Sequence, residues 1–335
     1  MLCDTGLRTA KLWKNLSDAQ IDSIVKKLTG ESGDSPAIYG YHLTDVPGAT
    51  CFPALAKAVA AVKKHAPGKL AYINVYPDYA TLGAPNLSQL ETQTYSEYLE
   101  RFVTEVKPQM LSYDNYMALY SMDMRDKTKA ASYYRNLLEV RRVSQKYHIP
   151  FWNTLAACQI RPHTTIPSPA NLRFQAYTTL AAGGRGVKWY TYYSRNVYNF
   201  APIDKHDGKS PTWHYLREVN HEMLTLGPLM NRLNSTGVFF SAPAPADSLP
   251  LLPGGFVEHV ECEAPVMVGE FSARDGSRYV MIVNCSLERS VKCAVKLRES
   301  RPAGIVSPAD GALLTIPEDG FWLVAGQGAL VKLEH

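Results

Sequence analysis

Two kinds of segment alternate along the first part of the chain. Short runs of β-branched, aromatic and other apolar residues are typical of buried strands, and each is followed by a longer segment whose apolar positions recur at helical spacing. The expected strands are 37–43, 70–75, 110–113, 150–155 and 186–192. The expected helices are 52–65, 94–106, 127–147, one that begins with Ser168 and Pro169, and 211–226. This alternation predicts βαβ units and a parallel sheet, either doubly wound or closed into a barrel.

Capping signals predict a further helix ahead of these units. Ser17 is followed three residues later by Gln20, which is the spacing of a capping box, and Gly30 is expected to end that helix. Residues 1–4 resemble the last part of a strand. At the far end of the region, Gly227 and Pro228 are expected to stop the helix 211–226.

The pattern changes after about Asn234. Segments rich in Gly and Pro now separate short runs with a period of two, which is typical of antiparallel strands. The expected strands are 257–260, 266–271, 278–283, 291–297 and 321–324. Asp275-Gly276 lies between two of them and predicts a hairpin turn. We therefore expect a second domain, a small antiparallel β-sandwich over 235–335, after a first domain over 1–234.

Two observations favour a barrel over a doubly wound sheet in the first domain. No G-x-G-x-x-G or P-loop motif follows any expected strand. Polar and aromatic residues gather at the expected carboxyl ends of the strands, where barrels build their sites: Asp45, Asn74, Tyr76, Asp114, Tyr116, Trp152, Asn153, Tyr190 and Tyr192. Only five βα units are clear, so the prediction is an incomplete TIM-type (β/α) barrel. An open barrel needs a cover, and we expect self-association or the sandwich to supply it.

Composition and charge limit the classes of binding partner that the protein is expected to have. The chain has 46% hydrophobic and 20% charged residues and a net charge of +4, which argues against a nucleic-acid or membrane partner. No signal peptide is expected, because residues 1–4 lead straight into charged sequence, and no transmembrane helix is expected, because no apolar run is long enough. Six cysteines lack metal-binding spacing, and although two of Cys262, Cys285 and Cys293 could pair, free thiols are expected. No metal or cofactor is therefore predicted.

Two strand ends resemble those of a known family. Residues 40–47, Gly-Tyr-His-Leu-Thr-Asp-Val-Pro, resemble the G-Y-x-L-x-D-E-P strand end of bacterial glycoside hydrolases of the (β/α)8-barrel, β-galactosidase-like type. Residues 111–116 are similar to that family's L-S-Y-D-H-Y. The resemblance implies a barrel followed by a β-sandwich and a β-linked carbohydrate substrate. It begins near the third family strand, which implies that the first two or three units are absent. A secreted or periplasmic origin is compatible with it, and the location stays open.

The resemblance fails at one decisive position. The Glu of D-E-P is the family's expected acid/base, and Val46 stands in its place here. Valine cannot transfer a proton, so that role does not carry over to residue 46.

Hydrolysis of a glycosidic bond needs two carboxyl groups, roughly 5 Å apart for retention and 6.5–9.5 Å apart for inversion. Asp45 and Asp114 are the acidic residues nearest to strand ends, and Asp114 is the best single candidate. A loop-capping role is the structural alternative for each. The candidates for binding sugar hydroxyls and ring faces are Asn74, Tyr76, Tyr116, Trp152, Asn153, His163, Tyr190 and Tyr192.

The leading hypothesis is therefore an enzyme, a glycosidase acting on O-glycosyl bonds of a β-linked glycan. The first alternative is a non-catalytic carbohydrate-binding pseudoenzyme, which Val46 favours. A second is a hydrolase disabled by a deliberate substitution at residue 46, for which Gln or Ala would be the usual choice. A third is a lyase or aldolase with a Schiff base on Lys188.

Overall fold

The computed structural model describes residues 2–4, 6, 10–33, 35–81, 88–121, 124–195 and 197–334. They form two compact units. The first holds residues 1–114 and 139–152, and the second holds residues 115–138 and 153–335. The predicted domain boundary at residue 234 stays a prediction.

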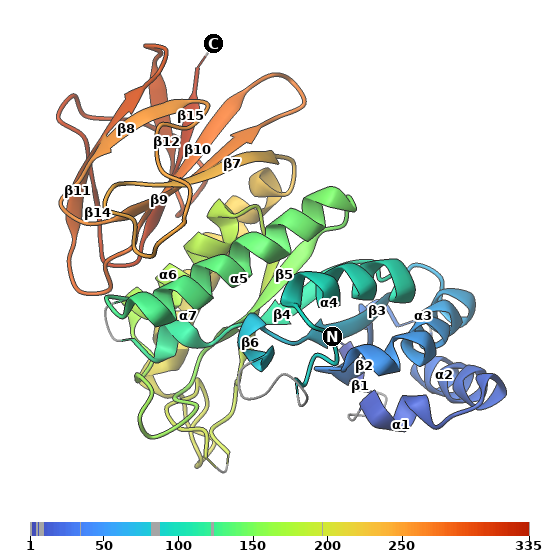
Figure 1. Cartoon of the computed structure of the whole chain (residues 1–335). Coiled ribbons are helices and arrows are strands. Elements are labelled where there is room, and N and C mark those ends of the chain that lie inside the picture. Colours follow the sequence, from blue (N-terminus) through green and yellow to red (C-terminus); the bar gives the residue numbers. More distant parts are fainter. Residues whose placement is uncertain are drawn as a thin grey trace. The chain divides into compact units, whose positions relative to one another are not determined.

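Six strands form the first sheet, in the order β1-β2-β3-β4-β5-β6. They are β1 (Leu2–Asp4), β2 (Gly40–Asp45), β3 (Leu70–Val75), β4 (Leu111–Asp114), β5 (Phe151–Ala156) and β6 (Gly186–Tyr190). Neighbours in space are neighbours in sequence, and the pairs β1–β2, β2–β3 and β3–β4 are parallel. Figure 1 labels these strands, and their order is that of consecutive βα units in a (β/α) barrel. This confirms the predicted incomplete (β/α) barrel.

Helices connect these strands. They are α1 (Ala10–Lys14), α2 (Asp18–Ser32), α3 (Phe52–His65), α4 (Tyr95–Arg101), α5 (Lys127–Lys146), α6 (Pro169–Ala181) and α7 (Pro211–Met230). A π-helical turn, Phe102–Val106, continues α4, and short 3-10 turns lie at Ala49–Cys51, Asp78–Thr81 and Met117–Leu119. The predicted capping box is confirmed, because the Gln20 amide N–H donates to the Ser17 hydroxyl while the Ser17 N–H donates to the Gln20 side chain.

Two predicted helix ends are wrong. Helix α2 continues past Gly30 to Ser32 and ends at Gly33, whose positive φ of 58° suits a residue without a Cβ. Helix α7 runs through Pro228 to Met230. Proline removes one backbone donor there, but the guanidinium of Arg185 donates to the carbonyl of Met230, the last helical residue, and to that of Leu233 just after the helix. Capping from a distant residue carries no local sequence signal.

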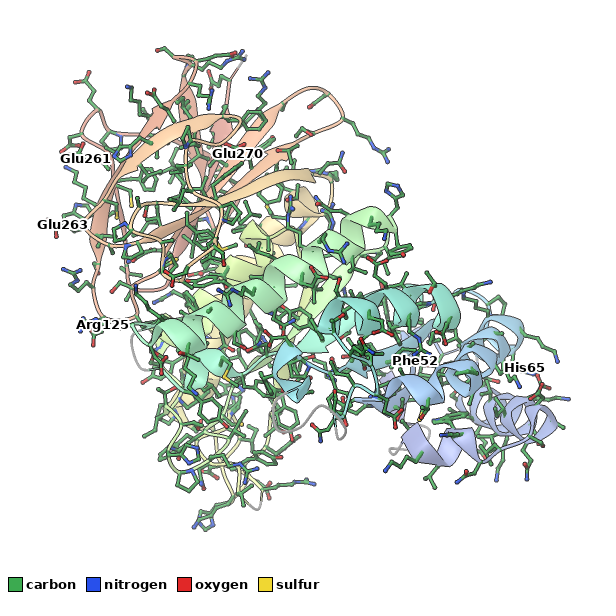
Figure 2. The ribbon with its side chains drawn as sticks, in the orientation of Figure 1. Phe52, His65, Arg125, Glu261, Glu263 and Glu270 are labelled. Atoms are coloured by element: carbon green, nitrogen blue, oxygen red, sulfur yellow. The ribbon has the colours of Figure 1, made fainter. Side chains whose placement is uncertain are left out.

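In the first unit, α3 packs its apolar side inward. Phe52, labelled in Figure 2, lies 5.4 Å from the ring of Tyr98 and 5.5 Å from that of Phe102. His65 at the end of α3 lies 2.9 Å from Asp22 of α2. These contacts hold the helices, so that the loop from β2 into α3 has a rigid support.

The second unit contains the predicted sandwich. One sheet has the order β13-β12-β15-β10-β9-β7 and the other β14-β11-β8. Their strands are β7 (Asn234–Phe240), β8 (Val257–Glu261), β9 (Val266–Ser272), β10 (Arg278–Asn284), β11 (Val291–Leu297), β12 (Ala303–Val306), β13 (Leu313–Thr315), β14 (Phe321–Leu323) and β15 (Gly328–Leu333). The hairpin at Asp275-Gly276 is confirmed, since Ser272 pairs with Arg278 across it. Strands β7, β12, β13 and β15 were not among the predicted strands.

One buried carboxylate braces the sandwich. Glu270 of β9 is only 2% exposed and is labelled in Figure 2. It accepts hydrogen bonds from the backbone N–H groups of Gly255, Phe256 and Val257, at 2.7–2.9 Å. A buried charge is tolerated when hydrogen bonds replace its water shell. The loop that leads into β8 is therefore tied to β9.

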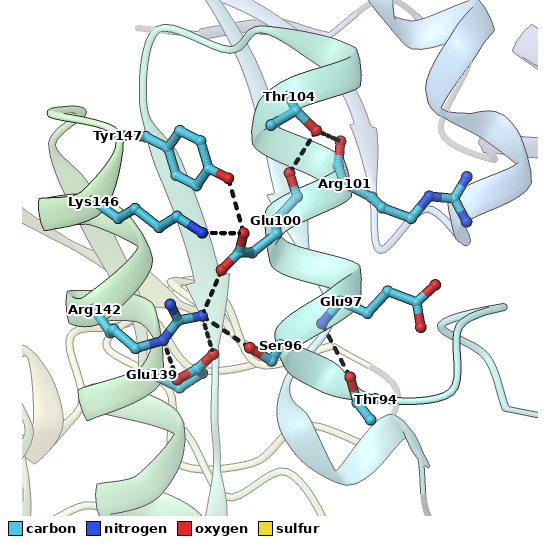
Figure 3. A network of polar contacts seen from close by, with 10 residues as sticks. All are labelled: Thr94, Ser96, Glu97, Glu100, Arg101, Thr104, Glu139, Arg142, Lys146 and Tyr147. Carbon is cyan, nitrogen blue, oxygen red and sulfur yellow. Dashed lines mark hydrogen bonds and ion pairs between the residues drawn. The ribbon is translucent and has the colours of Figure 1, made fainter.

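A second polar network joins α4 to the end of α5 (Figure 3). Glu100 accepts hydrogen bonds from Lys146 at 2.6 Å, from Tyr147 at 2.8 Å and from Arg142 at 3.0 Å. The hydrogen bonds from Lys146, Tyr147 and Arg142, in that order of size, lower the pKa of Glu100 to about 2. A carboxyl group with a lowered pKa stabilises the fold when it is charged.

We expect Glu100→Gln to lower the free energy of unfolding at pH 7 by about 1 kcal/mol, a figure that allows for solvent screening of a partly exposed group. The contribution of Glu100 is present in full above its ordinary pKa of 4.5 and is lost as the pH falls towards 2. Denaturant unfolding at several pH values should therefore show the two proteins converging between pH 4.5 and 2. Glu31→Gln, on the surface of α2, is the control. A difference that is independent of pH would contradict the assignment.

Candidate active site at the strand ends

The inward face of β3 and β4 is polar. Asp45 of β2 pairs with Asn74 of β3, and Asn74 pairs with Ser112 of β4. Residues two apart on a strand share a face, so Asp114 lies on the same side as Ser112, and Tyr72 on the same side as Asn74. The parallel register therefore brings these side chains together where β2, β3 and β4 end.

A chain of buried hydrogen bonds runs across this face. The Tyr72 and Ser112 hydroxyls lie 2.8 Å apart, and Ser112 donates to the side-chain oxygen of Asn74 at 3.0 Å. The amide nitrogen of Asn74 donates to the Asp114 carboxylate at 2.6 Å. Since Asn74 is 3% and Asp114 8% exposed, these bonds are shielded from water. The orientation of the Asn74 amide is fixed by its partners, so that its N–H donates to the Asp114 carboxylate.

Tyr76 shows which other charges lie nearby. Burial raises the pKa of Tyr76, and the negative charges of Asp45 and Glu91 and, more weakly, of Asp114 raise this pKa further. Three carboxylates thus act on one hydroxyl group. The structure brings Asp45, Asn74, Tyr76 and Asp114, four of the predicted site residues, into one neighbourhood.

Glu91 is a member of this neighbourhood that sequence analysis missed. Its carboxylate accepts from the backbone N–H of Thr50 at 2.8 Å and from the Thr50 hydroxyl at 2.5 Å. It lies over Gly48, where a Cβ would come within 2.6 Å of the carboxylate. Glu91 follows β3 at a distance and belongs to no motif, so no sequence signal indicates it. The structure nonetheless places this glutamate against the loop that carries Val46.

The backbone at Val46 is unusual. Its φ of 42° lies in the left-handed region, which is strongly disfavoured for a β-branched residue. The Val46 N–H donates to the Asn74 carbonyl at 2.8 Å, and the carbonyl of the next residue, Pro47, accepts from Tyr98 at 2.7 Å. Such a conformation persists only where surrounding contacts enforce it. The surrounding contacts thus hold the backbone of Val46, in the loop between β2 and α3, in a conformation that a valine side chain disfavours.

In the second unit, several predicted aromatic residues lie together. Tyr116 stacks on Tyr190, with ring centroids 5.9 Å apart, and Tyr190 meets Tyr198 edge to face at 5.4 Å. Tyr192 packs edge to face against Tyr193 at 5.2 Å, and both are more than two-fifths exposed. The loop after β6 therefore offers ring faces to solvent.

Three other predicted site residues lie elsewhere. Trp152 is the second residue of β5, not at its carboxyl end, and it lines a cavity with residues from the starts of other strands, such as Leu70 and Met110. Asn153 follows it, is fully buried and donates to Thr179 of α6 at 3.0 Å, which is a structural contact. The expectation that both end a strand is wrong, because β5 extends to Ala156. His163 is exposed and packs against Tyr120.

Within the described ranges, no group of three or more His, Cys, Asp or Glu side chains could hold a metal ion. Asp204, His206 and Asp207 lie close together in the sequence, but they form a turn. In this turn the Asp204 carboxylate accepts hydrogen bonds from the backbone N–H groups of His206 and Gly208. Among the described helices, none has both the length and the hydropathy that crossing a membrane requires.

Comparison with known proteins places the fold. No protein-family model and no curated protein matches the sequence. Gan42B, a GH42 β-galactosidase, matches the structure with a TM-score of 0.63 at 9% identity, over 95% of this chain and 82% of that chain. A glycoside hydrolase family 5 protein from Bacteroides vulgatus matches with a TM-score of 0.53 at 13% identity, over 98% and 67%. A further structure described as a glycoside hydrolase gives 0.53 at 14% identity, over 97% and 71%.

The chain has the fold of barrel glycoside hydrolases. At these identities the likeness extends to the fold alone. A candidate α-L-fucosidase from Bacteroides thetaiotaomicron is matched over 59% of its length at 13% identity, with a TM-score of 0.42 that is too low to support an argument. The fold alone assigns neither an activity nor a substrate to this chain.

The strain at Val46 can be measured. Asparagine tolerates the left-handed region better than valine, so we expect Val46→Asn to raise the free energy of unfolding by about 1 kcal/mol. Val197→Asn, at an exposed position, is the matched control and should change little. Denaturant unfolding of the three proteins provides the test. An equal loss of stability in both variants would show that Val46 is not strained.

Proposed function

We propose that this protein is a glycosidase that hydrolyses O-glycosyl bonds in a β-linked oligo- or polysaccharide. The proposal rests on the Asp114 carboxylate, which is buried at a strand end and accepts a hydrogen bond from the Asn74 amide at 2.6 Å. Burying a charge is costly, and a carboxylate kept there among further carboxylates suits chemistry better than packing. The glycoside hydrolase fold supports the same conclusion.

Two carboxyl groups share the work in glycoside hydrolysis. Asp114 is suited to be the ionised member, because the Asn74 N–H stabilises its charge; it would act as nucleophile or base. The second member must protonate the leaving oxygen. Val46 cannot do so, which leaves Asp45 and Glu91, the other two carboxylates that act on Tyr76. Glu91 approaches the β2–α3 loop from a different segment and is suited to take the place of the missing glutamate.

Sugar rings present C–H faces that stack on aromatic rings. The exposed Tyr192 and Tyr193, and the stacked pair Tyr116 and Tyr190, offer such faces. We propose that they bind the carbohydrate, whereas Trp152 and Asn153 do not take part.

The alternative is a carbohydrate-binding protein without catalysis. The observation in its favour is Val46, which occupies the position where the resembling family has its acid/base. In such a protein Asp114 and Asn74 would accept and donate hydrogen bonds to sugar hydroxyls without breaking a bond.

Sugar release from aryl glycosides and β-glucans tests the role of Asp114. We expect Asp114→Asn to lower kcat/KM by at least about 100-fold, because the amide is neutral and can be neither nucleophile nor base. Asp247→Asn, on an exposed side chain, is the control and should retain full activity. If the unmodified protein is silent and Val46→Glu gains activity, the binding alternative holds. Activity that survives Asp114→Asn would rule out the assigned role.

A second comparison identifies the partner carboxyl. We expect Glu91→Gln to lower kcat about 100-fold on substrates with poor leaving groups and much less on activated aryl glycosides, since those need little protonation. Asp45→Asn should show no such dependence on the leaving group. The reverse pattern would assign the acid to Asp45. Thermal unfolding of both variants separates loss of chemistry from loss of structure, because Glu91 also accepts two hydrogen bonds from Thr50.

A further inference from the structure

Two cysteines of the sandwich lie directly opposite each other. Cys262 follows β8 and Cys293 lies in β11, and these strands pair antiparallel with Ala294 opposite Glu261. One step further in this register sets Cys293 opposite Cys262. Their sulfur atoms are 3.4 Å apart, and the Cys293 thiol donates to Cys262. Sulfur atoms this close, on directly paired residues, need only side-chain rotation to reach bonding distance.

The two thiols differ in access. Cys293 is fully buried in the sandwich core. Cys262 is half-buried and lines a surface cavity of about 520 Å³, together with Glu263, Lys292 and Trp322. A small reagent in solution can therefore reach Cys262 but not Cys293.

The hydrogen bond between the two thiols changes their pKa values in opposite directions. The Cys293 thiol that donates to Cys262 lowers the pKa of Cys262 to about 7, although burial opposes the change. The hydrogen bond that Cys293 donates, followed by burial, raises the pKa of Cys293. Near neutral pH a substantial fraction of Cys262 is therefore thiolate, whereas Cys293 stays protonated.

We propose that Cys262 and Cys293 form a redox-active pair that closes to a cross-strand disulfide when a low-molecular-weight disulfide such as oxidised glutathione is present. The Cys262 thiolate attacks one sulfur of the oxidant, forms a mixed disulfide and releases one thiolate. Cys293 then loses its proton to solvent and attacks the Cys262 sulfur, which releases the second thiolate. The pair is oxidised by two electrons, and one oxidant disulfide is reduced to two thiols.

The other buried thiols should not compete. Cys51, Cys158 and Cys285 are at most 4% exposed, and burial raises the pKa of each. Of these five thiols, only Cys262 combines access to solvent with a lowered pKa.

The disulfide would enclose both layers of the sandwich. Between Cys262 and Cys293 the chain leaves the three-stranded sheet, forms β9 and β10 in the six-stranded sheet and returns as β11. Closing this loop restricts the unfolded chain, which stabilises the folded sandwich.

Treatment of the full chain with oxidised glutathione at about pH 7.5, which lies above the pKa of Cys262, tests the proposal. We expect intact mass spectrometry to show the loss of two hydrogens, peptide mapping to link Cys262 to Cys293, and the midpoint of thermal unfolding to rise by roughly 5 °C or more. Dithiothreitol should reverse all three changes.

Three variants sharpen the test. Cys285→Ser, the matched control, should still form the link. Cys293→Ala should instead keep a glutathione adduct on Cys262, and its alkylation by iodoacetamide at pH 7 should slow roughly fivefold to tenfold, because the hydrogen bond that lowers the pKa is gone. Unchanged alkylation of Cys262 in Cys293→Ala, a stable glutathione adduct on Cys262 of the unmodified protein, or a link that includes Cys285 would each overturn the proposal.

Discussion

The candidate site depends on one buried hydrogen bond, the 2.6 Å contact from the Asn74 amide to the Asp114 carboxylate. A carboxylate in a nearly dry interior must be compensated, or its pKa rises and it loses its charge. Asn74 can compensate it because Ser112 fixes the orientation of the amide. The parallel register of β3 and β4 sets Ser112 opposite Asn74, and Asp114 follows two residues later on the same face. The polar interior is therefore a consequence of how the strands pair, and the chemistry proposed for Asp114 depends on that pairing.

The loop that follows β2 shows a different constraint. Val46 adopts a left-handed backbone that valine disfavours, and hydrogen bonds from neighbouring strands and helices hold it there. Glu91 is drawn against the same loop by Thr50 and by the space that Gly48 leaves. The backbone conformation of this loop is thus set by the contacts around it and not by the preference of the valine side chain. A carboxyl group reaches the region from another segment, and this is why the loss of the motif glutamate does not by itself decide against catalysis.

Local patterns predicted most of the fold. The strand and helix alternation, the capping box at Ser17 and the hairpin at Asp275-Gly276 are signals within a few residues, and each is confirmed. Features set by distant contacts were missed: Arg185 supports the end of α7, and Glu91 reaches Thr50 across 41 positions. Asn74 and Asp114 lie at the carboxyl ends of β3 and β4, as expected. Trp152 does not lie at a strand end, although the expected strand 150–155 and the observed β5, Phe151–Ala156, differ by only one residue at each end. The error was to assign the second residue of a six-residue strand to its carboxyl end. Self-association stays a prediction.

The most direct test of the central claim is calorimetric titration of a β-linked oligosaccharide into the unmodified protein and into Asp114→Ala, at neutral pH. The claim is that the Asp114–Asn74 strand end is a carbohydrate site, and it holds for a hydrolase and for a binding protein alike. It predicts saturable heat with the unmodified protein and weakening of binding by at least about tenfold in the variant, because the hydrogen bonds of a charged acceptor are lost. Equal affinity in the two proteins, or no binding across a panel of β-linked sugars, would contradict it.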